Sequence, residues 1–177
     1  LVQPDHHVVT VAYSSVTGGW PGLVRLQPDG KPDPRFMARR LGSPFHPRAA
    51  LLPDGSFYMT WPEGERWDGV PVPRLIRVLS NGQRDLNFVP DLPELSPQQH
   101  PLAQALCITP DNGVLAGGDG FLLRYAADGS LVTRFAADPA EAVMKVWLLP
   151  SQHVLALTRA TDSSGLNPRW YNKLLRF

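Results

Sequence analysis

The sequence predicts an all-β protein, a β-propeller of four-stranded antiparallel blades with about 3.5 repeats of 47–52 residues. Three observations lead to this prediction. One pattern recurs along the whole chain, the apolar runs are short, and turns rich in Pro, Asp, Asn and Gly separate them. Short apolar runs bounded by such turns are typical of strands rather than helices. Four antiparallel strands in a unit of this length is the period of a propeller blade.

The repeat is defined by an arginine that ends a short apolar run. The arginines are Arg25, Arg77, Arg124 and Arg176, at steps of 52, 47 and 52 residues. A turn glycine and a phenylalanine follow each of the first three arginines and keep the same steps. These residues are Gly30, Gly82, Gly129, Phe36, Phe88 and Phe135. Because three landmarks move in register, we interpret the copies as structural equivalents.

A second landmark is a hairpin turn between two apolar runs. It is clearest at residues 53–55 and 110–113, with a weaker copy in residues 146–158. Asp, Asn and Gly favour such turns because they tolerate a positive φ. Each unit therefore predicts one strand before this turn, one after it, a third that carries the arginine and a fourth that ends at the phenylalanine. At the N-terminus only the second half of the hairpin is recognisable, as residues 7–13.

These landmarks divide a single propeller domain into units at residues 1–36, 37–88, 89–135 and 136–177. The first unit is expected to lack strand one and the last to lack strand four. We therefore expect an open arc or partial ring of a larger propeller, with a closed four-bladed propeller as the alternative. An open arc leaves strand edges unpaired, and such edges favour further repeats of a longer chain or a homo-oligomer.

Composition narrows the classes of function. The formal net charge of +1 gives no electrostatic reason to expect nucleic acid as a partner. No apolar run is long enough for a membrane span. The single cysteine, Cys107, is expected to be a small apolar strand residue. The five histidines lack metal-binding spacing, and no nucleotide-binding loop is present, so we expect no metal site and no cofactor.

The spacing Arg-Leu-x-x-Asp-Gly-x-x-Asp-x-x-Phe resembles the delta-sixty repeat, a bacterial β-propeller-like family whose general function is not established. The resemblance covers nearly the whole chain. The matching residues are Arg25, Asp29, Gly30, Asp33 and Phe36, then Arg77, Asn81, Gly82, Asp85 and Phe88, and then Arg124, Asp128, Gly129 and Phe135. The third copy has Val132 where the others have Asp. The resemblance implies a surface or secreted bacterial protein, extracellular or periplasmic, and supplies no catalytic residues.

The recurring arginines have two interpretations. They are either a ring of guanidinium groups that captures an anion, or structural residues that bind carbonyls or an aspartate such as Asp33 or Asp85 in their own blades. Because a residue that recurs once per blade serves the blade, we favour the structural interpretation. The recurring turn aspartates are likewise expected to shape turns rather than to bind calcium.

The non-repeating insertions carry the candidate binding residues. The repeat places residues 14–22, 62–73, 119–120 and 159–172 on one face of the assembly. Trp20, Trp67 and Trp170 lie in these insertions and are candidates for contact with carbohydrate or protein. The alternative is that their indoles fold back over the blade edges. Trp147, within a predicted strand, is expected in the core.

Two classes of function remain open. We favour a non-catalytic binding or scaffold module, part of a bacterial surface or secreted repeat protein, with protein or carbohydrate bound at the insertion face. The alternative is an enzyme of the glycosidase or lyase type, with its site at the propeller mouth. Glu63, Glu65 and Asp68 are then the candidate acid and base groups.

Overall fold

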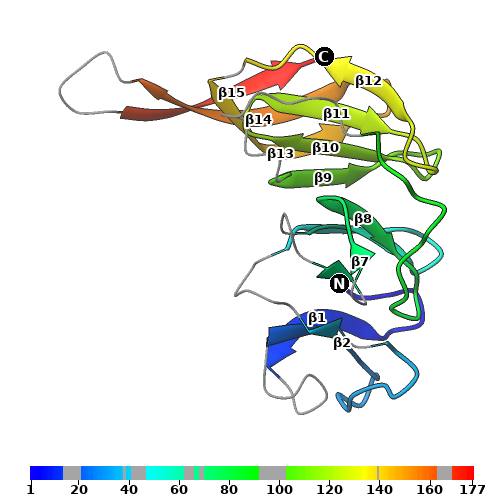
Figure 1. Cartoon of the computed structure of the whole chain (residues 1–177). Coiled ribbons are helices and arrows are strands. Elements are labelled where there is room, and N and C mark those ends of the chain that lie inside the picture. The colour runs from blue at the N-terminus through cyan, green and yellow to red at the C-terminus, as the bar shows by residue number, and fades with distance from the viewer. Residues whose placement is uncertain are drawn as a thin grey trace. The chain divides into compact units, whose positions relative to one another are not determined.

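The structure is a computed structural model of the chain, and it confirms the all-β prediction. It describes residues 1–13, 21–37, 39–40, 47–61, 66–67, 70–91, 103–138, 140–162 and 169–177. These residues contain strands and turns but no helix. Accordingly, none of the described segments is a helix with the length and apolar character needed to cross a membrane. The chain divides into two compact units, Leu1–Leu86 and Asn87–Phe177 (Figure 1).

The first unit contains three antiparallel sheets. One sheet has the order β1-β2-β3, with β1 at Val8–Tyr13, β2 at Pro21–Leu26 and β3 at Arg39–Arg40. The next has the order β4-β5-β8, with β4 at Ala49–Leu51, β5 at Phe57–Thr60 and β8 at Leu75–Val78. A small hairpin pairs β6 (Arg66–Trp67) with β7 (Val70–Pro71). The first two sheets pack around a core that includes Val9, Leu23, Phe57 and Ile76.

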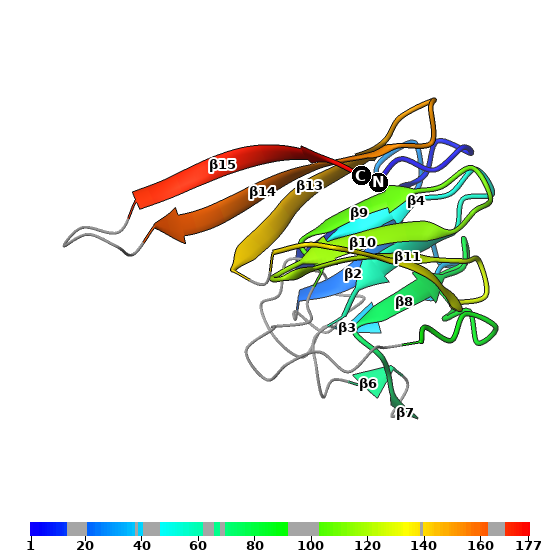
Figure 2. The same ribbon diagram turned by 90° about the horizontal axis from the view of Figure 1, so that it is seen from above.

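The second unit contains two antiparallel sheets that pack face to face (Figures 1 and 2). One has the order β12-β11-β10-β9, with β9 at Ala105–Ile108, β10 at Val114–Gly118, β11 at Phe121–Tyr125 and β12 at Leu131–Phe135. The other has the order β13-β14-β15, with β13 at Glu141–Leu148, β14 at Val154–Asp162 and β15 at Arg169–Arg176. Beyond the residues of β14 that pair with β13, β14 and β15 continue as a two-stranded ribbon (Figure 2).

One turn geometry recurs throughout both units. In each copy the fourth residue of the turn has a positive φ. Its backbone N–H donates to the carbonyl of the first residue of the turn. Within the described part of the chain, the residues with this geometry are His6, Gly30, Gly55, Gly82, Asn112, Gly129 and Gln152. A three-residue hairpin loop needs a left-handed residue at this point. The sequence therefore predicted these turns wherever Gly or Asn stands there. It recognised the copy with Gln152 only as a weaker one, within residues 146–158, and missed the copy with His6.

The turn at His6 corrects the prediction for the first repeat. Gln3 N–H donates to the His7 carbonyl at 2.8 Å, and Val2 and Val8 form an isolated β-bridge. The first repeat therefore keeps the end of strand one, rather than only its second half. The sequence concealed this because histidine replaces the glycine that marks the turn elsewhere.

The fourth strand of each repeat was expected to end at the phenylalanine. Of the three copies, only the third forms a strand there. There, β12 pairs with β11 up to Phe135. In the first copy, Asp33 N–H bonds to the Arg25 carbonyl at 2.8 Å, and the chain turns before Phe36. The second copy does the same at Asp85, whose N–H lies 2.9 Å from the Arg77 carbonyl. An Asp side chain favours such a turn, whereas β-branched Val132 favours a strand.

Candidate functional site

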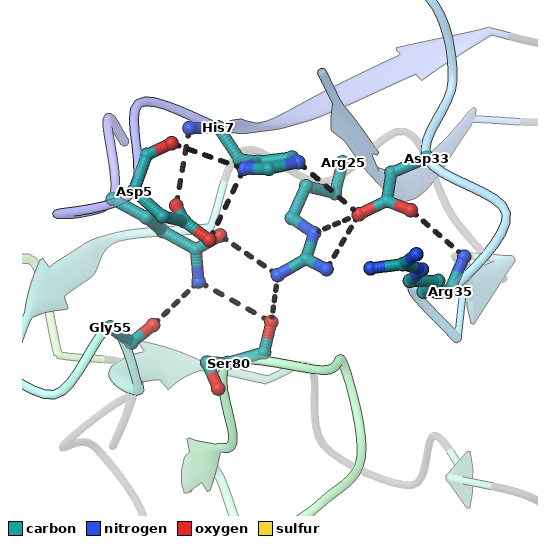
Figure 3. A network of polar contacts seen from close by, with 8 residues as sticks. Asp5, His7, Arg25, Asp33, Arg35, Gly55 and Ser80 are labelled. Atoms are coloured by element: carbon teal, nitrogen blue, oxygen red, sulfur yellow. Dashed lines mark hydrogen bonds and ion pairs between the residues drawn. The ribbon is translucent and has the colours of Figure 1, made fainter. Parts of the chain in front are cut away.

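Arg25 is the centre of a polar network that joins the first two repeats (Figure 3). It comes from β2, and its Nε donates to Asp33 Oδ2 at 2.8 Å while Nη2 lies 2.5 Å from the same oxygen. Its Nη1 donates to the Ser80 carbonyl of the second repeat at 2.7 Å. The guanidinium also lies over the Phe36 ring, 5.4 Å from its centroid. All three guanidinium nitrogens of Arg25 therefore contact groups of the protein itself.

His7 lies between two carboxylates of this network (Figure 3). Its Nδ1 is 3.1 Å from Asp5 Oδ2, and its Nε2 is 3.6 Å from Asp33 Oδ2. Burial raises the pKa of Asp33, but hydrogen bonds from the Arg35 backbone and the Arg25 side chain, with the charges of Arg25 and His7, lower it overall. The network thus holds Asp33 as a carboxylate.

Arg77 and Arg124 bind aspartates of their own repeats. Arg77 Nη2 lies 3.1 Å from Asp54 Oδ2, and its Nε lies 3.7 Å from Asp85. Arg124 Nη2 lies 3.1 Å from Asp111 Oδ2. Three of the four recurring arginines therefore contact turn aspartates, as the structural interpretation requires. The fourth, Arg176, is an exposed residue at the end of β15.

The tryptophan candidates are not brought together among the described residues. Trp67 is only 4% exposed, and its ring packs on Trp61 at a centroid distance of 4.9 Å. Of the two interpretations, Trp67 therefore follows the alternative, because the β6–β7 hairpin folds its indole into the core. Trp20 lies outside the described residues, and only the backbone of Trp170 is described, in β15. Trp147 was expected in the core but is 41% exposed.

The candidate acid and base residues of the enzymatic alternative, Glu63, Glu65 and Asp68, lie outside the described residues. Within the described part of the chain, no group of three or more His, Cys, Asp or Glu side chains is placed to hold a metal ion. A cavity of about 160 Å³ lies between the first turns of the first two repeats, lined by Gln3, Pro4, Asp5, Pro53, Asp54, Gly55 and Ser80. It is smaller than the roughly 300–1,000 Å³ of typical ligand pockets.

The outer face of the β13–β15 sheet is a feature that the sequence analysis missed. Cross-strand pairing places Trp147 beside Leu155, and Leu157 beside Leu174, on one face. The opposite face, with Val146 and Ala156, is buried against the β9–β12 sheet. We call the first of these faces the outer face of β13–β15. It carries the exposed Lys145, Trp147, Leu174 and Arg176 and the half-buried Leu155 and Leu157.

The repeat shows what this face corresponds to elsewhere. Leu174 is equivalent to Leu122, since both precede the recurring arginine by two residues. Leu122 is fully buried, in a cluster with Val143 of the neighbouring blade, whereas Leu174 is 62% exposed. The first repeat agrees with the third, because the equivalent Leu23 is 3% exposed and packs on the second repeat. Among the four equivalent leucines, Leu174 is therefore the exposed one.

Comparison with known proteins supports the fold. A family model described as a domain of unknown function with a β-propeller fold, DUF5122, matches residues 3–36. Two solved structures of the extracellular domain of one B. thetaiotaomicron protein are similar, described in one case as a hybrid two component system and in the other as a one component system. Both are 20% identical to this chain, with TM-scores of 0.57 and 0.56. The chain folds as β-propeller blades.

The similarity extends over most of this chain but only part of the solved proteins. Both alignments cover 94% of this chain and 21% of the solved chain, so the chain spans about a fifth of their length. A gluconolactonase from Xanthomonas campestris is also similar, at 15% identity and a TM-score of 0.44, over 88% of this chain and 45% of its own. Among curated proteins, none matches this sequence.

Proposed function

We propose that this chain is a non-catalytic binding and scaffold module, part of a bacterial surface or secreted β-propeller repeat protein, and that the outer face of β13–β15 binds a protein partner. The partner is a second blade-like surface, because an equivalent face in this chain is covered by a blade. The observation that carries the proposal is the contrast between Leu122, fully buried, and Leu174, 62% exposed at the equivalent position.

The chemistry of the recurring residues supports a non-catalytic role. Arg25, Arg77 and Arg124 bind aspartates in their own repeats, so their charges are used to hold turns. The cavity between the first two repeats, of about 160 Å³, is small for a substrate. By contrast, large apolar side chains such as Trp147 and Leu174 are exposed together on one sheet face. Exposed apolar surface bordered by charged residues is typical of a protein-binding site.

An extracellular location fits this role. The two similar B. thetaiotaomicron structures are extracellular domains, and they are about five times longer than the part that this chain matches, since the alignments cover 21% of each. Arrays of repeats in such proteins present extended surfaces to partners. We therefore place the binding face of this chain outside the cytoplasm, as one part of a larger surface.

Self-association tests the proposal, with the chain itself as the probe. Sedimentation equilibrium over about 10 μM to 1 mM, a range that detects weak interfaces, should show reversible association. Leu174→Lys should abolish it, because a charge cannot be buried in an apolar interface without a partner. Leu86→Lys is the matched control, since Leu86 is 73% exposed and is not one of the residues of this face.

Two results would contradict the proposal. One is a monomer at every concentration for both the unsubstituted chain and Leu174→Lys. The other is turnover in a broad hydrolase screen that is lost in Glu63→Gln, Glu65→Gln or Asp68→Asn.

A further inference from the structure

The Asp29–Gly30 turn of the first repeat differs from its two equivalents because it is uncovered. Gly82 and Gly129 are buried, whereas Gly30 is exposed. At Gly82 an added Cβ would lie 2.9 Å from the Phe36 ring, and at Gly129 it would lie 2.4 Å from the Val89 carbonyl. At Gly30 no atom of the described chain lies within 4 Å of that position.

Gly82 is covered by the end of the preceding repeat. Phe36, the last landmark of the first repeat, is 5% exposed and lies against Gly82. The next residue, Met37, donates its backbone N–H to the Asn81 carbonyl at 2.9 Å. An aromatic side chain and one backbone donor thus attach the end of one repeat to the Asn-Gly turn of the next.

The same attachment is found in the second unit, at the Asp128–Gly129 turn. Val89 follows Phe88 and donates its N–H to the Asp128 carbonyl at 2.8 Å. Asp91 N–H continues the contact to the Gly129 carbonyl at 3.0 Å, and its carboxylate accepts from Leu131 N–H at 3.1 Å. Two turns in this chain therefore receive the same backbone donor, from the residue that follows the Phe of the preceding repeat. At Gly129 the glycine is covered by the backbone of Val89 and Pro90.

We propose that the Asp29–Gly30 turn is a docking site for the free end of another repeat, a segment with Asp-x-x-Phe followed by an apolar residue. The Phe would cover Gly30, and the next backbone N–H would donate to the Asp29 carbonyl. Among the described residues, no backbone donor binds either the Asp29 or the Gly30 carbonyl. The site rests on the repeat geometry and is separate from the outer face of β13–β15.

The chain does not supply this segment from its own described residues. Phe36 and Met37 are already engaged on the Gly82 turn, and Val89 on the Gly129 turn, while Phe88 is buried at 1% exposed. The third copy has Val132 in place of the aspartate and ends in β12, with Phe135 against Phe177 at a centroid distance of 5.5 Å. A second copy has the same segments engaged in the same way, so the occupant is a repeat end from another source.

The test uses a synthetic peptide with the sequence of residues 84–91, Arg-Asp-Leu-Asn-Phe-Val-Pro-Asp. Titrated into the isotope-labelled chain, it should shift the backbone amide resonances of residues 27–31 and leave those around Gly82 and Gly129 unchanged. Replacing the peptide Phe by Ala, or its Val by Pro to remove the N–H donor, should weaken binding at least about tenfold each, since each removes one of the two contacts.

Gly30→Asn is the matched change in the chain. Asn tolerates a positive φ, and Asn112 occupies the same turn position at φ 59°, so the fold should be retained. The added side chain fills the space that the Phe needs, and peptide binding should be lost. The proposal is overturned if saturating peptide leaves residues 27–31 unshifted, or if Gly30→Asn binds as well as Gly30. It is also overturned if these resonances shift with the chain's own concentration, because a second copy is then the occupant.

Discussion

Arg25 and Asp33 form an ion pair in which the arginine side chain is 10% exposed and the carboxylate is 3% exposed, with Nη2 and Oδ2 2.5 Å apart. The pair links β2 to the turn before Phe36, and the same arginine donates to the Ser80 carbonyl of the second repeat. The contact therefore stabilises one blade internally and attaches it to the next. Its burial makes it a sensitive point for testing the structural interpretation of the recurring arginines.

Arg25→Met should destabilise the chain by about 3 kcal/mol, because it leaves Asp33 buried without its cation. The measurement is urea unfolding followed by circular dichroism. Lys31→Met is the control: the Lys31–Asp29 pair is exposed, with side chains 78% and 49% accessible, and should contribute less than about 1 kcal/mol. Equal unfolding midpoints for the two variants would show that Arg25 is not a structural residue.

Trp67→Ala should lower the free energy of unfolding by about 3–5 kcal/mol, because it removes a buried ring that packs on Trp61. Trp147→Ala should cost much less, since that ring is 41% exposed. Thermal unfolding of the two variants makes the comparison directly. If Trp147→Ala were the more damaging change, the core would lie where the sequence analysis expected it.

Features that local chemistry decides could be predicted from the sequence. Features that depend on a neighbouring blade could not. The turns at Gly30, Gly55 and Gly82 are set by local backbone preference, so they were predictable. The alternation along β13 is also local, but which face is covered depends on the next blade. Trp147 was therefore assigned to the wrong environment, and that of Trp67 was left open, since a sequence window carries no information about the surface that packs on it.

The contacts of the recurring arginines also divide into those set by local spacing and those set by packing between blades. The contacts of Arg25 with Asp33 and of Arg77 with Asp85 join residues eight positions apart, and the recurring spacing pointed to both. The contact of Arg25 with the Ser80 carbonyl spans 55 residues and depends on how two blades pack. Sequence spacing alone could not indicate it, because any blade-to-blade distance along the chain varies with the insertions.

Stability should fall as the pH drops below about 4. The folded-state pKa of Asp33 is below its ordinary value of 3.8: burial raises it, but the Arg35 backbone hydrogen bond and the Arg25 contact outweigh this. The unfolded state then binds more protons between the two pKa values. The stabilisation is therefore present above the unfolded pKa and lost as pH falls through the folded pKa.

The check is the urea midpoint at pH 7, 4 and 3 for the unsubstituted chain and for Asp33→Asn. The variant should be less stable at pH 7 and should lose less stability on acidification, because the group that takes up the proton has been removed. Parallel pH profiles for the two proteins would show that Asp33 does not contribute to the acid sensitivity.

Gly117 allows β10 to approach β13 closely. An added Cβ at Gly117 would lie 2.5 Å from Val143 Cγ1 and 2.9 Å from Val143 Cβ. Gly117→Ala should therefore destabilise the second unit by about 1–3 kcal/mol through overpacking. Val143→Ala alone should also destabilise it, through the cavity that it creates.

The two changes together should cost less than the sum of their separate costs, because the alanine methyl at position 117 enters the space that Val143 vacates. A double-mutant cycle by urea unfolding measures this coupling, with an expected size of about 1–2 kcal/mol. Val114→Ala with Val143→Ala provides a comparison. Val114 is also buried, but its replacement by alanine adds no methyl group toward β13. Strict additivity of Gly117→Ala and Val143→Ala would mean that β10 and β13 are not in contact in solution.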